Sequence, residues 1–195
     1  MNVLVLGGTR FLGRHIVEQL ANDGHRVVCF HRGETRALLP EGVEERYGDR
    51  NADLNGVAAA SWDAIVDTCV YRPEQMQRSL ELRTGRYVMI STVNVYADLS
   101  LPRIAETAPL IEAFDPADEA AAYGGNKAAC ERLVMERYPR ESVVLRPGLI
   151  AGRWDPTGRF TYWCDRLLRG GRVLAPGEPK RFVQFVDASD IAAFV

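Results

Sequence analysis

Short apolar runs that alternate with helix-like segments are the feature that most constrains the fold of this chain. Apolar residues at helical spacing, such as Leu12, Ile16 and Leu20, lie between the runs. The runs show no regular polar alternation, which is typical of strands buried on both faces. The sequence therefore predicts a doubly wound α/β fold with a parallel sheet. The six expected strands are Val3–Leu6, Arg26–Phe30, Val43–Tyr47, Ala64–Thr68, Tyr87–Ser91 and Val143–Leu145.

Composition excludes several classes of protein. The 195 residues are enough for one sizeable domain, and a net charge of −2 gives no general attraction to nucleic acid or to an anionic membrane. No apolar run approaches the ~20 residues of a membrane span, and a strand that begins at Asn2 leaves no room for a signal peptide. Cys29, Cys69, Cys130 and Cys164 lie far apart, which favours reduced thiols over a metal site. We therefore expect a cytoplasmic protein with no membrane, metal or nucleic-acid partner.

The stretch GGTRFLG, residues 7–13, stands between the first strand and the first helix. Gly7 can take the positive φ of a tight turn, and Gly13 lets the helix approach the sheet closely. The main-chain amides of such a turn face the helix N-terminus, where a pyrophosphate is stabilised. Glycine spacing alone is equally typical of a structural turn, but the strand before it and the amphipathic helix after it favour dinucleotide binding. Arg10 stands where a central glycine is usual.

A tyrosine and a lysine occur at helical spacing in AAAYGGNKAACERLV, which places Tyr123 and Lys127 on one face. Of the 24 basic residues only this lysine and Lys180 are not arginine, which suggests a task that arginine does not meet. An ammonium beside a phenol favours the phenolate and can move its pKa from ~10 towards neutrality. The alternative is a partly solvated helix face. Gly124 and Gly125 each cost a helix about 1 kcal/mol, so we expect a ligand to approach there.

Two hydroxyl side chains, Ser91 and Thr92, follow the fifth expected strand. Ligands of open α/β sheets bind at the carboxyl ends of strands, so either hydroxyl could hold a substrate oxygen. A turn that uses the hydroxyl to close the strand is the alternative. A long loop is predicted for residues 99–118, which are rich in proline, alanine and acidic residues.

Together these motifs resemble the short-chain dehydrogenase/reductase superfamily, and within it the extended NAD(P)-dependent epimerase/dehydratase branch. The resemblance covers essentially the whole chain and includes the glycine loop, GDR at 48–50, ISTVNVY, YGGNK, LRPGLIAGR and FVQFVDASDIA. It implies a Rossmann fold with a dinucleotide-binding domain at 1–150 and a substrate-binding part at 151–195 that is truncated. A helix opens at Asp187 with little chain after it, so we expect this end to be frayed or held by a neighbouring molecule.

The resemblance also implies roles for individual residues. Tyr123 would donate or accept the proton, Lys127 would bind the nicotinamide ribose and lower the pKa of that tyrosine, and Thr92 would be the active-site hydroxyl. Asp49 and Arg50 would lie by the adenine. The other residues implied to bind the cofactor are Gly7, Thr9, Arg10, Phe11, Leu12, Gly13, His31, Arg32, Thr68, Cys69, Val70, Pro147 and Gly148. The family further implies a homodimer through the Tyr123 helix and a helix near 73–82.

Cofactor choice depends on two departures from the family pattern. The second strand ends in Phe30-His31-Arg32 without the acidic residue that commonly holds the ribose of NAD. Arg10 is tolerable in the loop if its φ is negative. With Arg32 it would clamp a 2′-phosphate, because these two cations are expected to have no acidic group nearby. This favours NADP(H), with NAD as the alternative.

Two functions of different classes remain open. One is an oxidoreductase or epimerase that acts on a carbonyl or secondary alcohol, for which a nucleotide-linked sugar is a candidate. The other is a non-catalytic dinucleotide sensor or an RNA-binding protein, because GGTRF(L/I)G also resembles chloroplast stem-loop-binding proteins. The presence of Thr92, Tyr123 and Lys127 together favours the enzyme. A set of arginines suits a basic patch, a diphosphate site or a solvated helix face: Arg153, Arg159, Arg166, Arg169 and Arg172.

Overall fold

The computed structural model describes residues 1–100 and 102–195, and its centre is a six-stranded sheet in the order β3-β2-β1-β5-β7-β8. All neighbouring strands of this sheet pair in parallel. The fold prediction is confirmed, and each strand ends within one residue of its expected position. The strands are β1 (Asn2–Leu6), β2 (Arg26–His31), β3 (Glu44–Tyr47), β5 (Ala64–Asp67), β7 (Tyr87–Ile90) and β8 (Ser142–Leu145).

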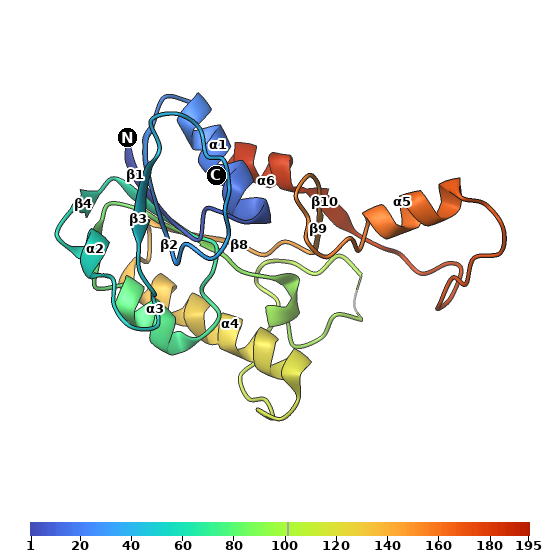
Figure 1. The fold of residues 1–195 in the computed structure, drawn as a ribbon. Helices are drawn as coiled ribbons and strands as arrows, with labels where there is room; N and C mark the ends of the chain where they lie inside the picture. Colours follow the sequence, from blue (N-terminus) through green and yellow to red (C-terminus); the bar gives the residue numbers. More distant parts are fainter. Residues whose placement is uncertain (101) are drawn as a thin grey trace.

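Helices cover both faces of the sheet, as Figure 1 shows. On one face α1 (Phe11–Asn22) and α6 (Ala188–Phe194) bury apolar side chains against the sheet. On the other face α3 (Pro73–Ser79) and α4 (Glu119–Arg137) do the same. Successive residues of a strand point to opposite faces, so the same strands supply both cores.

The remaining elements are short. A second parallel pair joins β9 (Leu149–Ala151) to β10 (Phe185–Asp187), and a third joins β4 (Ser61–Trp62) to β6 (Arg83–Thr84). The helix α5 (Thr161–Leu168) extends away from the sheet (Figure 1). Two further short helices are α2 (Asn55–Ala58) and the 3₁₀ turn η1 (Val93–Val95).

The expectation of a frayed end after Asp187 is wrong. The Asp187 carboxylate accepts a hydrogen bond from the Ser189 N–H at 2.8 Å and begins α6, as the sequence indicated. Ile191 and Ala192 are then buried in the same core cluster as Ile16 of α1. The sequence argument failed because the packing partner is more than 170 residues away in the chain. The division of the chain at residue 150 stays a prediction.

The glycine pair of α4 serves packing within the protein, which corrects the expected approach of a ligand. A Cβ on Gly124 would lie 2.2 Å from the carbonyl oxygen of Asn94, and one on Gly125 would lie 2.0 Å from the Phe114 ring. These contacts seat η1 and the loop before α4 directly on the helix. In its described residues, the predicted loop 99–118 contains neither helix nor strand.

Candidate functional site

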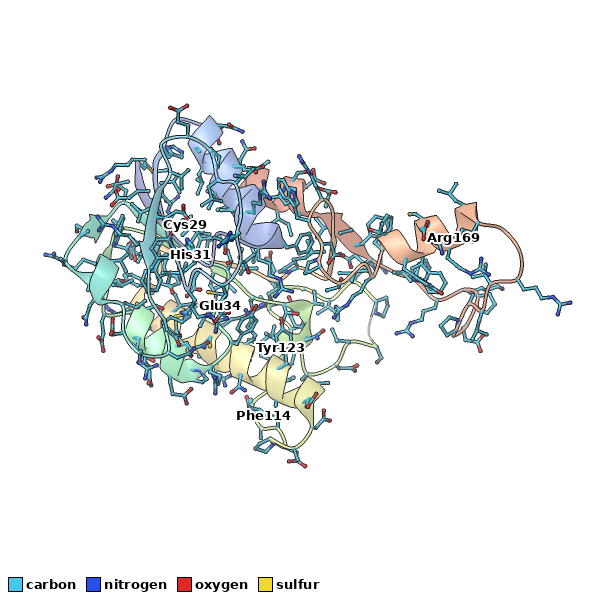
Figure 2. The ribbon with its side chains drawn as sticks, viewed as in Figure 1. Cys29, His31, Glu34, Phe114, Tyr123 and Arg169 are labelled. Atoms are coloured by element: carbon cyan, nitrogen blue, oxygen red, sulfur yellow. The ribbon has the colours of Figure 1, made fainter. Side chains whose placement is uncertain are left out.

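A cavity of about 660 Å³ opens at the carboxyl ends of the parallel strands. This is the position and the size expected of a small-molecule site in an open α/β sheet. Figure 2 shows Tyr123 on α4, His31 at the end of β2, and Glu34 between their labels. The expected site residues that line the cavity are Gly7, Thr9, Arg10, Phe11, Leu12, Gly13, His31, Arg32, Asp49, Arg50, Thr68, Cys69, Tyr123 and Lys127.

Four expected site residues are not among the described residues that line the cavity. The Val70 side chain is fully buried in the core beside α3 and α4. The Thr92 hydroxyl accepts the Asn94 N–H at 3.2 Å and begins η1, while Ser91 lines the cavity instead. The other two are Pro147 and Gly148. The functional roles given to these four residues stay predictions.

The glycine loop is shaped by close contacts at its two ends. Gly7 has a φ of 90°, and the Thr68 hydroxyl donates to its carbonyl oxygen at 3.0 Å. A Cβ on Gly13 would lie 2.1 Å from that same oxygen, so the expected close approach of the helix is confirmed. Arg10 has an extended backbone with φ −130°, so its position needs no glycine. Besides Gly7, the loop residue with a positive φ is Phe11, at 40°.

Lys127 lies beneath the cavity with a side chain that is almost fully buried, at 2% exposure. Its Nζ donates to the Ile90 carbonyl oxygen at 2.7 Å, which joins the middle of α4 to the end of β7. Burial lowers the pKa of this ammonium from its ordinary value, and the Asp67 carboxylate opposes that shift. Tyr123, one helical turn earlier, is 37% exposed and borders the cavity. The pair therefore presents a buried cation and an accessible phenol to the same space.

A buried ion pair fixes α4 behind this site. Glu131 is fully buried and forms a salt bridge with Arg146, with Nη2 and Oε2 2.7 Å apart. The Ser91 hydroxyl donates to the same carboxylate. Glu131 follows Lys127 by one helical turn, so the same face of α4 carries both groups.

A second buried pair joins the turn after β3 to the end of β5. The Arg50 guanidinium donates to both Asp67 oxygens at 2.6 and 2.8 Å, and the Tyr87 hydroxyl donates to the same carboxylate at 2.7 Å. Burial opposes ionisation of Asp67, but Arg50 outweighs it and holds the pKa of the carboxyl below its usual range. Arg50 also donates to the Ser79 hydroxyl. Although Arg50 lines the cavity, most of its donors are therefore satisfied within the protein.

Acidic groups lie beside His31 and Arg32 at the end of β2, so the expectation of no acid near Arg32 is wrong. His31 Nε2 lies 2.8 Å from Glu45 Oε2, and Arg32 Nη2 lies 2.8 Å from Glu34 Oε2. Glu45 comes from the neighbouring strand β3, a pairing that linear sequence does not reveal. Within the described residues, Arg10 forms no ion pair. An anionic ligand at this end of the cavity could therefore pair with Arg10 without displacing a carboxylate of the protein.

The arginines of the C-terminal region contact their own segment. Arg166 donates to the Gly170 carbonyl at 2.7 Å, and Arg169 pairs with Asp165 at 2.5 Å. Figure 2 places Arg169 at the end of α5, far from Tyr123. In the part of the chain that the structure describes, no cluster of acidic, histidine or cysteine side chains is arranged to hold a metal. No described helix is long and apolar enough to cross a membrane.

Comparison with known proteins identifies relatives across the whole chain. The model of the NAD dependent epimerase/dehydratase family matches residues 3–195. A 2′-dehydrokanamycin reductase of Streptomyces kanamyceticus is 33% identical over an alignment of 158 residues, which covers 77% of this chain and 43% of the relative. A chloroplast stem-loop binding protein of 41 kDa from Arabidopsis thaliana is 23% identical over an alignment of 210 residues, which covers 97% of this chain and 53% of the relative.

A solved structure of MoeE5 in complex with UDP-glucose and NAD aligns with a TM-score of 0.70 at 25% identity. The alignment covers 98% of this chain and 69% of MoeE5. The chain spans about half the length of the curated relatives that it matches.

Proposed function

Because this chain belongs to the NAD dependent epimerase/dehydratase family, we propose that it is an NAD(P)-dependent oxidoreductase or epimerase acting on a carbonyl or secondary alcohol. NADP(H) is the preferred cofactor of this proposal, and a nucleotide-linked sugar is its leading substrate class. The observation that carries it is the meeting of the glycine loop, Tyr123 and Lys127 at one cavity. If the glycine loop were only a structural turn, nothing would explain why it shares a cavity with a tyrosine–lysine pair suited to proton transfer.

The residues at the cavity fit a dinucleotide. Gly7 and Gly13 form a cradle that a Cβ would fill, and the loop amides between them would hold the pyrophosphate. Lys127 would hold the nicotinamide ribose, and Asp49 with the turn that follows it would lie by the adenine. When bound, the nicotinamide supplies a hydride donor or acceptor.

Proton transfer is the task of the chain's own side chains. Tyr123 is exposed to the cavity, so its hydroxyl can give a proton to a carbonyl oxygen or take one from an alcohol. The Lys127 ammonium stabilises the phenolate left behind, and its bond to the Ile90 carbonyl keeps it in place. The hydroxyls of Ser91 or Thr92 would orient the substrate oxygen. Tyr123 is thus the proposed acid and base of one reversible reaction.

The substrate class is supported by what the relatives act on or bind. One is named as a reductase of 2′-dehydrokanamycin, and the MoeE5 structure holds UDP-glucose with NAD. 2′-Dehydrokanamycin and UDP-glucose are both sugar-derived molecules with carbonyl or hydroxyl groups.

We further propose that the protein forms a homodimer through α3 and α4.

The alternative function is binding of RNA without catalysis, which the likeness to a chloroplast stem-loop binding protein favours. The arginines in and just after α5 do not join the cavity, since Arg166 and Arg169 bind groups of their own segment. An RNA-binding protein of this fold would need neither Tyr123 nor Lys127.

The test is to denature freshly purified protein and identify any released dinucleotide by mass spectrometry. The protein is then incubated with UDP-sugars and NADP(H) or NAD(H), and conversion is followed by NMR. We expect NADP(H) to be retained or bound and at least one sugar substrate to be converted. Binding of a stem-loop RNA with no dinucleotide binding and no conversion would overturn the proposal in favour of the alternative.

A further inference from the structure

The Lys127 ammonium carries three N–H donors but has few protein partners. Among the described residues its hydrogen-bond acceptor is the Ile90 carbonyl oxygen, at 2.7 Å. The charged and titratable groups around it come from several elements: Asp67 at the end of β5, Arg50, Cys69, Tyr123, and Cys130 on its own helix. Asp67 is bound to Arg50 and Tyr87, and among the described residues its ion pair is with Arg50. A nearly fully buried cation therefore needs a further source of stabilisation.

Tyr71 supplies an aromatic face at this point. The Lys127 Nζ lies 5.0 Å from the centroid of the Tyr71 ring, within the range of a cation–π interaction. The Tyr71 ring also lies 6.5 Å from the ring of Tyr123. Tyr71 lines the cavity and is 49% exposed, so it is a wall of the site and not part of the core.

The backbone of Tyr71 is held firmly in place. Its N–H donates to Gln75 Oε1 at 2.7 Å, in the first turn of α3. The side-chain amide of Gln75 in turn donates to Asn51 Oδ1 at 2.7 Å, in the turn after β3. Two separate segments therefore fix the direction in which the Tyr71 ring leaves the chain.

We propose that Tyr71 is a positioning residue, whose ring face keeps the Lys127 side chain charged and directed into the cavity. Its effect on catalysis rests on the proposed function, whereas the contact between ring and ammonium does not. A ring face stabilises the cation without adding a formal negative charge beside Tyr123. A carboxylate in this place would form an ion pair with Lys127 and would repel both a phenolate and a phosphate-bearing ligand.

The test uses the fact that the chain has two lysines. Protein labelled with ¹³C and ¹⁵N in lysine gives side-chain signals from Lys127 and from the exposed Lys180, which serves as an internal control. The signals are titrated with pH, without cofactor, in wild type, Tyr71→Phe and Tyr71→Leu. Tyr71→Phe keeps the ring face and should leave the proton affinity of Lys127 within about twofold. Tyr71→Leu removes the face and should weaken that affinity about tenfold.

Turnover provides the second readout. The alkaline limb of the pH profile should move to lower pH in Tyr71→Leu, because Lys127 loses its proton earlier, and should stay in place in Tyr71→Phe. Equal Lys127 titrations in wild type and Tyr71→Leu would overturn the proposal, as would an equal shift in both variants. If the titrations differ as expected but not even the wild type transfers hydride, the contact stands and the proposed function fails. Circular dichroism of each variant verifies that it is folded.

Discussion

Gly13 packs against the carbonyl group of Gly7 so closely that a Cβ on Gly13 would lie 2.1 Å from the Gly7 oxygen. The first turn of α1 is therefore held directly against the end of β1. Neither side of the contact can move aside easily, since both are backbone and the Thr68 hydroxyl also binds the Gly7 oxygen. The proposed phosphate site depends on this one contact.

Gly13→Ala should therefore weaken dinucleotide binding at least tenfold and destabilise the fold by about 1–3 kcal/mol, as overpacking does. Gly56→Ala is the matched control, because Gly56 lies in α2 and a Cβ there would have its nearest neighbour at 3.8 Å. We expect the control to keep both properties. Urea unfolding and fluorescence titration with the dinucleotide measure the two effects. Normal binding by a folded Gly13→Ala would show that the glycine loop does not hold the ligand.

Tyr123→Phe should keep cofactor affinity within a few fold and lower turnover by a factor of about 10²–10⁴, because only the transferred proton is lost. Lys127→Ala should reduce both affinity and turnover, since its side chain is proposed to contact the cofactor as well as the phenol. Tyr162→Phe on the exposed helix α5 is the control for loss of a tyrosine hydroxyl. The assay follows NADPH absorbance with any substrate that wild type accepts. An unchanged rate in Tyr123→Phe would remove this residue from the mechanism.

Asp67→Asn should destabilise the protein by about 3–5 kcal/mol, because it leaves the Arg50 guanidinium buried without its counter-charge. The folded pKa of Asp67 lies below its ordinary value of ~3.9, so its ionisation stabilises the fold above that pH. This stabilisation is lost as the pH falls through the folded pKa. Wild type should thus lose stability below about pH 4 more steeply than Asp67→Asn.

Urea unfolding at several pH values measures this difference. The double variant Asp67→Leu with Arg50→Met is the control, because it removes both charges and should cost less than Asp67→Asn alone. Parallel pH dependence in wild type and Asp67→Asn would mean that Asp67 does not supply the acid-sensitive stability.

The sequence predicted the features that depend on neighbours in the chain. Buried strands need apolar runs and a tight turn needs a residue such as Gly7, so the sheet and the loop could be located. Helical spacing likewise placed Tyr123 and Lys127 on one face. The pairing of Arg50 with Asp67 was not predictable, because it joins two segments whose distance is set only by the folded sheet.

Residues that pack from distant segments were misjudged or missed for the same reason. Gly124 was expected to make room for a ligand, but a Cβ there would meet the backbone of Asn94 in η1. Tyr71 follows a strand whose end was expected to line the cofactor site. No pattern in the sequence indicates that its ring will contact Lys127, because the two residues belong to separate segments. The residues around β2 similarly gave no indication of Glu45, which lies on the neighbouring strand β3 and contacts His31.

The last prediction concerns Arg10 and the choice between NADP(H) and NAD(H). The extended backbone of Arg10 suits any residue, so the loop loses nothing in conformation by lacking a glycine there. Its guanidinium is exposed at the cavity, beside Arg32, which is paired with Glu34. Both partners of that pair are more than half exposed, so a 2′-phosphate can replace the glutamate at little cost.

Wild type should therefore bind NADPH more tightly than NADH, and Arg10→Gly with Arg32→Ala should lose that preference. Glu34→Gln should strengthen it several fold, because Arg32 then has no competing carboxylate. Arg36→Ala is the control, an exposed arginine in the same segment that does not line the cavity in the described structure. Fluorescence titrations at low and high salt provide the measurement, since an electrostatic preference should shrink as salt screens it. Equal affinity of wild type for the two dinucleotides, or an unchanged preference in the double variant, would mean that Arg10 does not select the cofactor.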